Sequence, residues 1–422
     1  MPWGVLSRYG LYQANERGRR LGTKYSTLLR ENWAAKLPKT STSTTSTVHH
    51  QQHHQQQHTH EKHHHAHNHN LIEAYSSNFN RTQLSCAGVL DGFLYTFNQT
   101  LHNYPSLQAL WTPPVIPITI APSNVCPIGV FDSGNGIMAH ARTIFAGPVV
   151  RNREEELKSY SSTLIQAIPY FQIPPTAYTG NNVNQSTKVS AAPTPIHFVG
   201  DTGDKTNRFL WIRAFDYLHT SSQHLLTVPQ TIQQYEYIAN KHLVWRFRTL
   251  FSHHPILALA SRNLLNIILS NIEEDIKKLS TPSSSHTSSA LPQFPVVRLF
   301  SGHDVTIMPL LYAMSLNAPH SVIKIGYPSG KEIEVTTAND INYQVPWPNY
   351  SSSLSFELYE ISNNNYSIEW CFENERLPRG TDISSPVSVM KDEEILYMKG
   401  TLTIETLRKI IDYIESVCPR EI

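Results

Sequence analysis

The sequence has few cysteines, few charged residues and no long apolar run, and each shortage excludes a class of protein. Four cysteines in 422 residues, none spaced as zinc ligands, form neither a disulfide framework nor a zinc module. They leave room for one or two disulfide bonds, whose pairing stays open. Lys and Arg number 34 against 33 Asp and Glu, and a net charge of +1 argues against binding along a nucleic-acid backbone. Because no run of about 18 apolar residues occurs, we expect no membrane-spanning helix in this chain.

The remaining composition is that of a folded protein. Hydrophobic residues make up 40% of the chain, which is enough for a sizeable core, and charged residues make up 16%. The first ten residues, MPWGVLSRYG, contain neither the basic nor the apolar region of a signal peptide. Asn-x-Ser/Thr sequences would suit a secreted glycoprotein, but a chain this rich in Asn, Ser and Thr contains several by chance. They begin at Asn80, Asn98, Asn184, Asn349 and Asn365.

Half of the 22 histidines fall in one low-complexity stretch, His49–His69, which follows a run of Ser and Thr. Such a stretch has too few apolar residues to bury a core, so we expect a disordered insertion over residues 36–70. A tolerated surface repeat is the favoured interpretation. Loose binding of Zn²⁺, Cu²⁺ or Ni²⁺ by neighbouring imidazoles is the alternative. Thr281–Ala290 is expected to be a second exposed loop.

Hydrophobic periodicity predicts helices and strands that interleave along the chain, which is typical of an α/β protein. The expected helices are Gly10–Leu29, Gln83–Phe97, Arg153–Ile168, Tyr235–Leu250, Ile256–Leu279 and Thr401–Val417. The expected strands are Pro295–Ser301 and a hairpin made by Ser352–Ile361 and Tyr366–Phe372.

The most informative segment is PVVRLFSGHDVTIMPLLYAM, a predicted strand, turn and helix. His303 and Asp304 stand where the helix Val305–Met314 should begin. The N-terminus of a helix at the carboxyl end of a strand offers free N–H groups and a positive dipole end, which suit a phosphate. Histidine can donate to a phosphoryl oxygen, and aspartic acid can protonate a leaving group. The alternative is that Asp304 only caps the helix.

Four segments resemble the histidine acid phosphatase family, and they occur in the order of its motifs. Leu6–Tyr25 resembles the family's first helix, and Tyr75–Thr82 its segment R-S-T-x-x-x-R-T. Thr194–Phe198 resembles its stretch P-I-P-V-H-x. The last match is the S-x-H-D-x-T turn at Ser301–Thr306, which is followed by an F-E-L-Y strand at Phe356–Tyr359. The resemblance implies a histidine phosphatase (phosphoglycerate mutase-like) fold, with a central mixed sheet flanked by helices. It also implies one domain over residues 1–35 and 71–422, with an inserted helical cap at roughly 113–250.

The resemblance also implies a mechanism. In the family a histidine of an R-H-G-x-R-x-P motif attacks phosphorus, arginines bind the phosphoryl oxygens, and the aspartate of the His-Asp pair protonates the departing alkoxide. By position, His303 and Asp304 are then catalytic residues and Arg81 is a substrate-binding residue. These roles suit the side chains, because arginine forks match phosphate oxygens and an acid must face the leaving group. No metal or cofactor is implied, and the expected partner is a small phosphorylated substrate or a phosphorylated glycan.

Two departures from the family matter. The R-H-G-x-R-x-P motif is absent, and we interpret this as N-terminal truncation. The alternative is that Arg8-Tyr9-Gly10 is a degenerate copy of the motif. Tyr75 stands where most members have a phosphate-binding arginine. The chain is therefore predicted to be either a phosphatase whose nucleophile lies upstream or a non-catalytic pseudophosphatase that keeps the cleft.

Finer similarity points to one branch of the family. The H-D-V-T form of the acid motif, His254–Leu257 and Cys126-Pro127 resemble 2-phosphoxylose phosphatase, which acts in glycosaminoglycan linker synthesis. That branch also looks to lack the arginine that Tyr75 replaces. Its members are Golgi enzymes with an N-terminal anchor, so the resemblance implies a Golgi or secretory location.

Overall fold

A computed structural model describes a large part of the chain, in segments. These are residues 6–36, 72–109, 114–120, 122, 126–130, 136–168, 211–223, 228–280, 297–316, 322–336, 345–362, 365–375 and 395–418. The His49–His69 tract, the Thr281–Ala290 loop and the Thr194–Phe198 stretch lie outside the described residues.

The predicted α/β class is confirmed, and the described strands form two sheets. In the first, β1 (Ile72–Ser76) lies between β2 (Ile118–Ile120) and β3 (Val297–Ser301) and is parallel to both. The second has the order β5-β4-β8-β7-β6, and its neighbouring strands run antiparallel. Its strands are β4 (Ile323–Gly326), β5 (Glu332–Val335), β6 (Ser353–Ser362), β7 (Asn365–Glu373) and β8 (Tyr397–Thr403). The expected central mixed sheet is thus hydrogen-bonded as one parallel and one antiparallel part.

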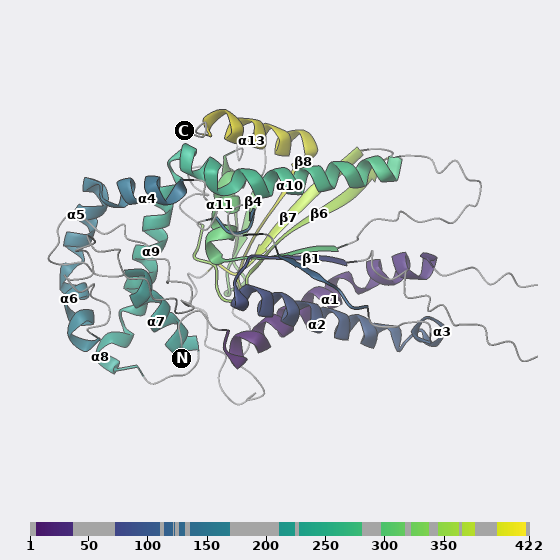
Figure 1. Cartoon of the computed structure of the whole chain (residues 1–422), viewed down its shortest axis with the longest axis horizontal. Helices are drawn as coiled ribbons and strands as arrows, with labels where there is room; N and C mark the ends of the chain where they lie inside the picture. Colours follow the sequence, from purple (N-terminus) through teal and green to yellow (C-terminus); the bar gives the residue numbers. More distant parts are fainter. Residues whose placement is uncertain are drawn as a thin grey trace, which may run out of the picture.

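Helices flank the sheets as expected (Figure 1). On one side α1 (Arg8–Lys36) and α2 (Asn80–Leu101) pack together beneath β1, and on the other α10 (His254–Ser280) and α13 (Ile404–Val417) cover the antiparallel sheet. Helices α1 and α2 approach each other closely because each has glycines that face the backbone of the other. A Cβ on Gly18 would lie 2.0 Å from the Val89 carbonyl oxygen, and one on Gly92 would lie 2.0 Å from that of Asn15. Substitution at either glycine would force these helices apart.

A group of helices lies to one side of the sheets (Figure 1). They are α4 (Ile137–Phe145), α5 (Pro148–Glu156), α6 (Lys158–Ala167), α7 (Trp211–Gln223), α8 (Gln230–Gln233) and α9 (Glu236–Phe251). All of them fall in or next to the range predicted for the helical cap, whose boundaries stay a prediction. The short α3 (Pro105–Gln108) follows α2.

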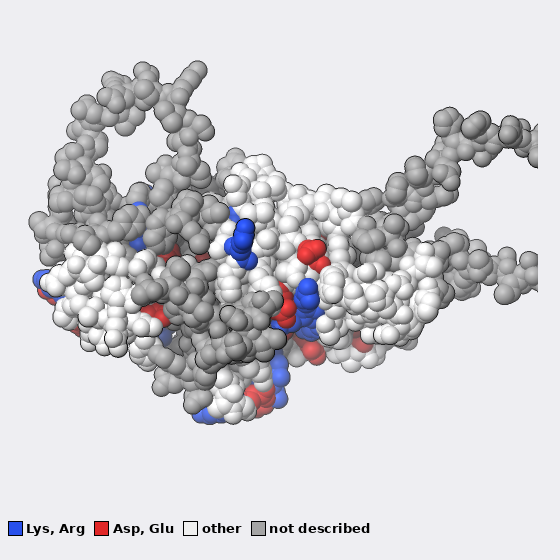
Figure 2. Space-filling model, turned by 90° about the horizontal axis from the view of Figure 1, so that it is seen from below, with Lys and Arg blue, Asp and Glu red and all other residues white. Residues whose placement is uncertain are grey.

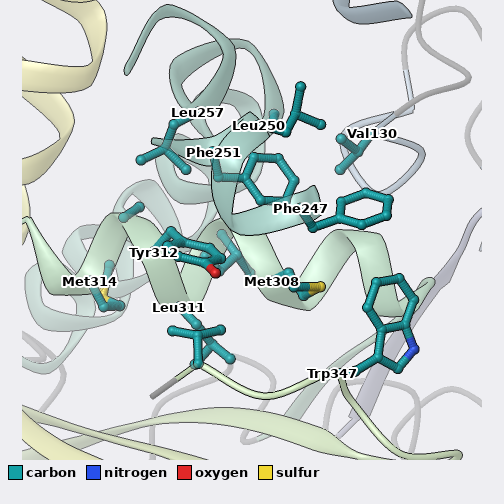
Figure 3. Packing of buried hydrophobic residues seen from close by; sticks show 14 of the residues in the cluster. Val130, Phe247, Leu250, Phe251, Leu257, Met308, Leu311, Tyr312, Met314 and Trp347 are labelled. Carbon is teal, nitrogen blue, oxygen red and sulfur yellow. The ribbon is translucent and has the colours of Figure 1, made fainter. Parts of the chain in front are cut away.

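One hydrophobic core joins this helical group to the antiparallel sheet through α11 (Asp304–Ser315). Figure 3 shows Met308 and Tyr312 of α11 on the side of Phe247 and Phe251 of α9, and Leu311 on the opposite side of α11, toward the strands. Each of these five side chains is at most 2% exposed. Because close-packed interiors resist displacement, the N-terminus of α11 has a fixed position relative to the helical group.

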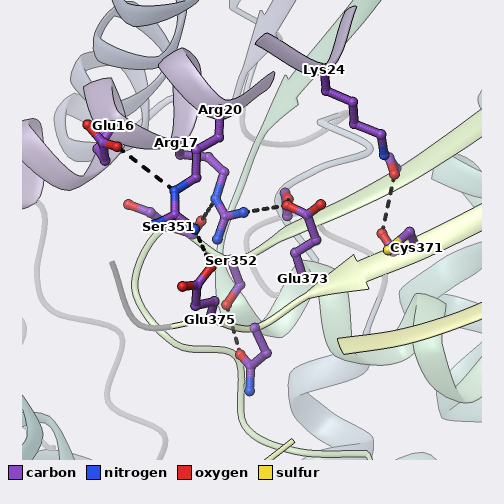
Figure 4. A network of polar contacts seen from close by, with 12 residues as sticks. Glu16, Arg17, Arg20, Lys24, Ser351, Ser352, Cys371, Glu373 and Glu375 are labelled. Atoms are coloured by element: carbon purple, nitrogen blue, oxygen red, sulfur yellow. Dashed lines mark hydrogen bonds and ion pairs between the residues drawn. The ribbon is translucent and has the colours of Figure 1, made fainter. Parts of the chain in front are cut away.

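A set of ion pairs ties α1 to the antiparallel sheet (Figure 4). Arg17, whose side chain is 3% exposed, pairs with Glu373 of β7, and its Nε donates to the Ser351 carbonyl oxygen at 2.8 Å. Arg20 pairs with Glu375 at the surface, and Lys24 with Glu357 of β6. We call Arg17, Arg20, Lys24 and their three glutamate partners the α1 network.

One helix bears on the expectation that no segment spans a membrane. By length and composition α10 could cross a membrane, with a mean hydropathy of 1.2 over its most apolar window. About 39% of that window is buried within the structure, and α10 packs against α11 and α13. A core helix passes the same test of length and composition, so this one helix is weak support for a membrane span.

Most of the predicted elements are present, with two corrections. The hairpin strands are confirmed as β6 and β7, and the helix predicted at Arg153–Ile168 is two helices that meet at Leu157. Thr401 to Thr403 belong to β8, so the last helix begins at Ile404, where the Thr403 side chain caps it. The four cysteines are free.

Charged side chains on the face shown in Figure 2 are of both signs, and Lys or Arg lies next to Asp or Glu. This mixture fits the near-zero net charge of the whole chain.

Candidate active site

The site lies where β1 and β3 end. These strands are parallel and in register, with Ser76 opposite Ser301, so the residues that follow them leave the sheet at the same edge. The Ser77 N–H donates to the Ser301 carbonyl oxygen at 3.2 Å, which continues the pairing into the two turns. The carboxyl end of a parallel sheet is the common place for a ligand site.

The turn after β3 is fixed by Thr306. Its hydroxyl accepts a hydrogen bond from the His303 N–H at 3.1 Å and donates to the Ile128 carbonyl oxygen at 2.6 Å. His303 is the N-cap of α11, with extended backbone. The turn also requires glycine, because a Cβ on Gly302 would lie 2.4 Å from Cγ2 of Ile128. His303 and Asp304 are therefore held at the positive end of the α11 dipole.

Arg81 and His303 meet across the two turns. Arg81 belongs to the first turn of α2, and its Nη2 lies 3.2 Å from Nδ1 of His303. A guanidinium only donates, so Nδ1 accepts and the ring hydrogen is on Nε2. Nε2 lies 3.4 Å from the Ser77 hydroxyl, and the Phe79 ring meets the imidazole edge-on at 5.0 Å between centroids.

The charge state of His303 follows from these neighbours. Burial, and then the positive charge of Arg81, lower the pKa of His303 to about 4. The imidazole is therefore neutral at physiological pH. In this state its Nε2–H can donate to an oxygen of an anion that Arg81 attracts.

Asp304 is placed to hold a proton. Burial raises the pKa of its carboxyl group, and the Val305 N–H, Arg81, His219 and the Trp347 side chain oppose this only in part. The Val305 N–H donates to Oδ1 at 2.8 Å, and the Trp347 side chain also hydrogen-bonds to this carboxyl group. The contact is to the next residue, and the helix N-cap is His303, so the structure does not show Asp304 in the capping role of the alternative interpretation.

The sequence analysis missed further polar residues beside Asp304. Asp216 and His219 lie one turn apart on α7, and the pKa of Asp216 is raised to about 7 by burial and then by the charge of Asp304. Tyr350 interacts electrostatically with Asp216, Asp304 and Arg81, and burial raises its pKa. The i, i+3 spacing of Asp216 and His219 was the only sign in the sequence, because their approach to Asp304 depends on how the helical group packs.

Tyr75 does not take the place of a phosphate ligand. Alternate residues of a strand face opposite sides, so Tyr75 points away from the side of Ala74 and Ser76. Its hydroxyl donates to Glu73 at 3.1 Å and its ring stacks on Phe300 at 5.0 Å. In the structure Tyr75 thus contacts Glu73 and Phe300, and its standing in place of a phosphate-binding arginine stays a prediction.

The structure thus brings together the three residues that the sequence predicts for the site, Arg81, His303 and Asp304. Their roles stay predictions at this point. Among the described residues there is no group of three or more His, Cys, Asp or Glu side chains arranged to hold a metal ion. The chemistry open to these three residues is binding of an anion by Arg81 and His303, with proton donation by Asp304.

Comparisons with known proteins give a similarity of fold. No protein-family model matches the sequence, and no curated protein matches it. Among solved structures, the phytase from Citrobacter braakii is similar, with 12% identity, a TM-score of 0.47 and coverage of 100% of this chain and 91% of that one. The apo form of Hafnia alvei phytase has 10% identity, the same TM-score and coverage of 100% and 90%. Its complex with myo-inositol hexakis sulphate has 10% identity, a TM-score of 0.39 and coverage of 83% and 81%.

At such low identity the similarity does not say which residues act. The chemistry of the site is argued from its own geometry.

Proposed function

We propose that the protein binds and hydrolyses phosphate monoesters at the N-terminus of α11. The observation that supports this is the meeting of Arg81 with a neutral His303 beside a half-buried Asp304. Arg81 attracts the phosphoryl group, and Nε2–H of His303 donates to one of its oxygens. When the bond between phosphorus and the ester oxygen breaks, the Asp304 carboxyl group gives its proton to that oxygen, so the product leaves as an alcohol.

In the family that the chain resembles, a histidine attacks phosphorus and takes the phosphoryl group as the ester bond breaks. Water then hydrolyses this phosphohistidine and releases phosphate. These two steps rest on that resemblance alone. A second function, binding of a phosphorylated ligand without hydrolysis, is favoured by the absence of an R-H-G-x-R-x-P motif. The two functions share the same binding residues and differ only in turnover.

Phosphate release from two substrates separates these functions. The wild-type protein and Asp304→Asn are assayed with an alkyl phosphate, whose leaving group needs a proton, and with p-nitrophenyl phosphate, whose leaving group does not. We expect Asp304→Asn to lower turnover of the alkyl phosphate by roughly 10²- to 10⁴-fold and to affect p-nitrophenyl phosphate much less. Equal losses on both substrates would make Asp304 structural. Phosphate binding without any release would support the non-catalytic function, and neither binding nor release would reject both.

The finer proposal is that the substrate is a phosphorylated sugar such as 2-phosphoxylose, met in the Golgi or secretory pathway. It is supported only by the resemblance of the H-D-V-T turn, Cys126-Pro127 and His254–Leu257 to that branch. Cys126-Pro127 and His254–Leu257 have structural contacts here. Cys126 is 2% exposed, and Nδ1 of His254, the first residue of α10, contacts the Tyr413 hydroxyl of α13. Release of phosphate from 2-phosphoxylose at a rate above that for other sugar phosphates would support this proposal.

A further inference from the structure

His219 has a buried ring nitrogen that none of the described residues hydrogen-bonds. The residue is 3% exposed, and its Nδ1 lies 3.1 Å from Oε1 of Glu236 on α9. A carboxylate only accepts, so Nδ1 carries a hydrogen and the ring is held in one orientation. Nε2 is buried and has no hydrogen-bond partner among the described residues. A buried polar atom without a partner costs free energy, so a partner supplied by a ligand would stabilise this arrangement.

Aromatic contacts hold the imidazole firmly. Phe215 stacks on it with centroids 4.9 Å apart, and the Tyr350 ring lies 5.2 Å away on a tilted plane. The Tyr350 hydroxyl is 2.7 Å from that of Thr220, so α7 and the chain around Tyr350 are joined beside His219. A binding group with a fixed position loses little entropy when a ligand arrives.

The His219 ring is also next to the proposed acid. Trp347 packs edge-on against Phe215 at 5.7 Å, and its side chain hydrogen-bonds to Asp304. His219 itself interacts electrostatically with Asp304, and so does Asp216, one turn earlier on α7. The residues of α7 therefore lie on the side of Asp304, where the leaving alcohol has to be.

The charges around this position select the chemistry of that alcohol. Asp216, Asp304 and Glu236 are acidic, and Arg81 is the cation that interacts with both Asp216 and Asp304. A second phosphate on the alcohol would be repelled by the Glu236 carboxylate, and it would gain no ion pair with Asp216 or with the protonated Asp304. A hydroxyl group both donates and accepts, so it can pair with Nε2 of His219 and with the Asp216 carboxyl in either of their protonation states.

We propose that Asp216 and His219 bind hydroxyl groups of the substrate's alcohol, so that the preferred substrate is a monophosphate of an uncharged, polyhydroxylated alcohol. This inference rests on the proposed function for the position of the phosphoryl group. The inference goes beyond the proposed function in one respect: the acidic residues of the site should disfavour alcohols that carry more than one phosphate.

The test compares wild type with His219→Phe, which keeps a ring between Phe215 and Tyr350 but lacks Nε2. Both proteins are assayed with glucose 6-phosphate, p-nitrophenyl phosphate and myo-inositol hexakisphosphate. We expect the wild type to prefer glucose 6-phosphate to myo-inositol hexakisphosphate. The ratio of kcat/KM for glucose 6-phosphate to that for p-nitrophenyl phosphate should fall about 10-fold in His219→Phe, the worth of one hydrogen bond. An unchanged ratio, or a preference for the hexakisphosphate, would overturn the inference.

Failure of the proposed function is distinguishable from failure of this inference. If the wild type releases no phosphate, calorimetry compares the binding of glucose 6-phosphate with that of inorganic phosphate. The inference then expects tighter binding of the sugar phosphate by the wild type and loss of that difference in His219→Phe. Equal affinities for the two ligands in the wild type would contradict it.

Discussion

The α1 network and the site at α11 both contain an arginine between a helix and a sheet, but the two arginines have different partners. The charge of Arg17 is met by Glu373, and the side chain is almost fully buried. Arg81 is exposed and hydrogen-bonds to the neutral His303, and among the described residues Asp216 and Asp304 interact with it electrostatically without an ion-pair contact. The charge of Arg17 is used within the fold, whereas an arginine without a direct carboxylate partner keeps its attraction for an anionic ligand.

The comparison predicts the largest loss of stability at Arg17. Arg17→Met removes a buried guanidinium that makes both the ion pair with Glu373 and the hydrogen bond to the Ser351 carbonyl oxygen. Losing both contacts should lower the free energy of unfolding by about 3 kcal/mol. Phosphate binding should be retained in the folded protein. Chemical denaturation measures the change.

Arg20→Met is the matched control, since it removes a neighbouring cation of α1 whose ion pair with Glu375 is exposed. It should cost less than about 1 kcal/mol. If Arg17→Met and Arg20→Met lowered the free energy of unfolding equally, the burial of Arg17 would not explain its contribution to stability.

A smaller loss is expected where the fold supports the site. Thr306→Val removes the hydroxyl that joins His303 N–H to the Ile128 carbonyl oxygen and leaves both buried groups without it. This should lower the free energy of unfolding by about 2 kcal/mol and weaken phosphate binding as well. Thr306→Ser keeps the hydroxyl and serves as the control. A loss of stability without any change in phosphate binding would mean that the turn after β3 does not position the phosphate-binding residues.

The smallest effect is a dependence of stability on pH. The pKa of His303 is lowered to about 4 in the folded protein, below the value near 6.5 of an unfolded histidine. As pH falls from 7.5 to 5.5, the unfolded chain takes up this proton and the folded protein does not, so stability falls. Relative to His303→Gln, the wild type should lose about 1 kcal/mol more over this range. Denaturation at the two pH values measures the difference, and parallel losses would argue against a buried, neutral His303.

The sequence predicted the turn after β3 because its residues are local. The apolar run Val297–Phe300, Gly302 and the polar pair His303-Asp304 are contiguous, and each follows a known preference of strand end or helix start. The long helices α1, α2 and α10 were predicted for the same reason, since their apolar periodicity extends over several turns.

The residues on α7 could not be predicted in this way. Asp216 and His219 reach Asp304 only because α9, α11 and the chain around Trp347 pack together in three dimensions. The short strands β2, β4 and β5 were also missed, because three or four residues give too little alternation to detect.

The central claim is that the N-terminus of α11 binds a phosphoryl group through Arg81. Titration of the full chain with orthovanadate by calorimetry tests it most directly, with Arg81→Ala beside the wild type. We predict that the wild type binds vanadate and that Arg81→Ala binds it about 10- to 100-fold more weakly, with unchanged stability, because a charged hydrogen bond is lost. Absence of binding by the wild type, or equal affinity in the two proteins, would contradict the claim.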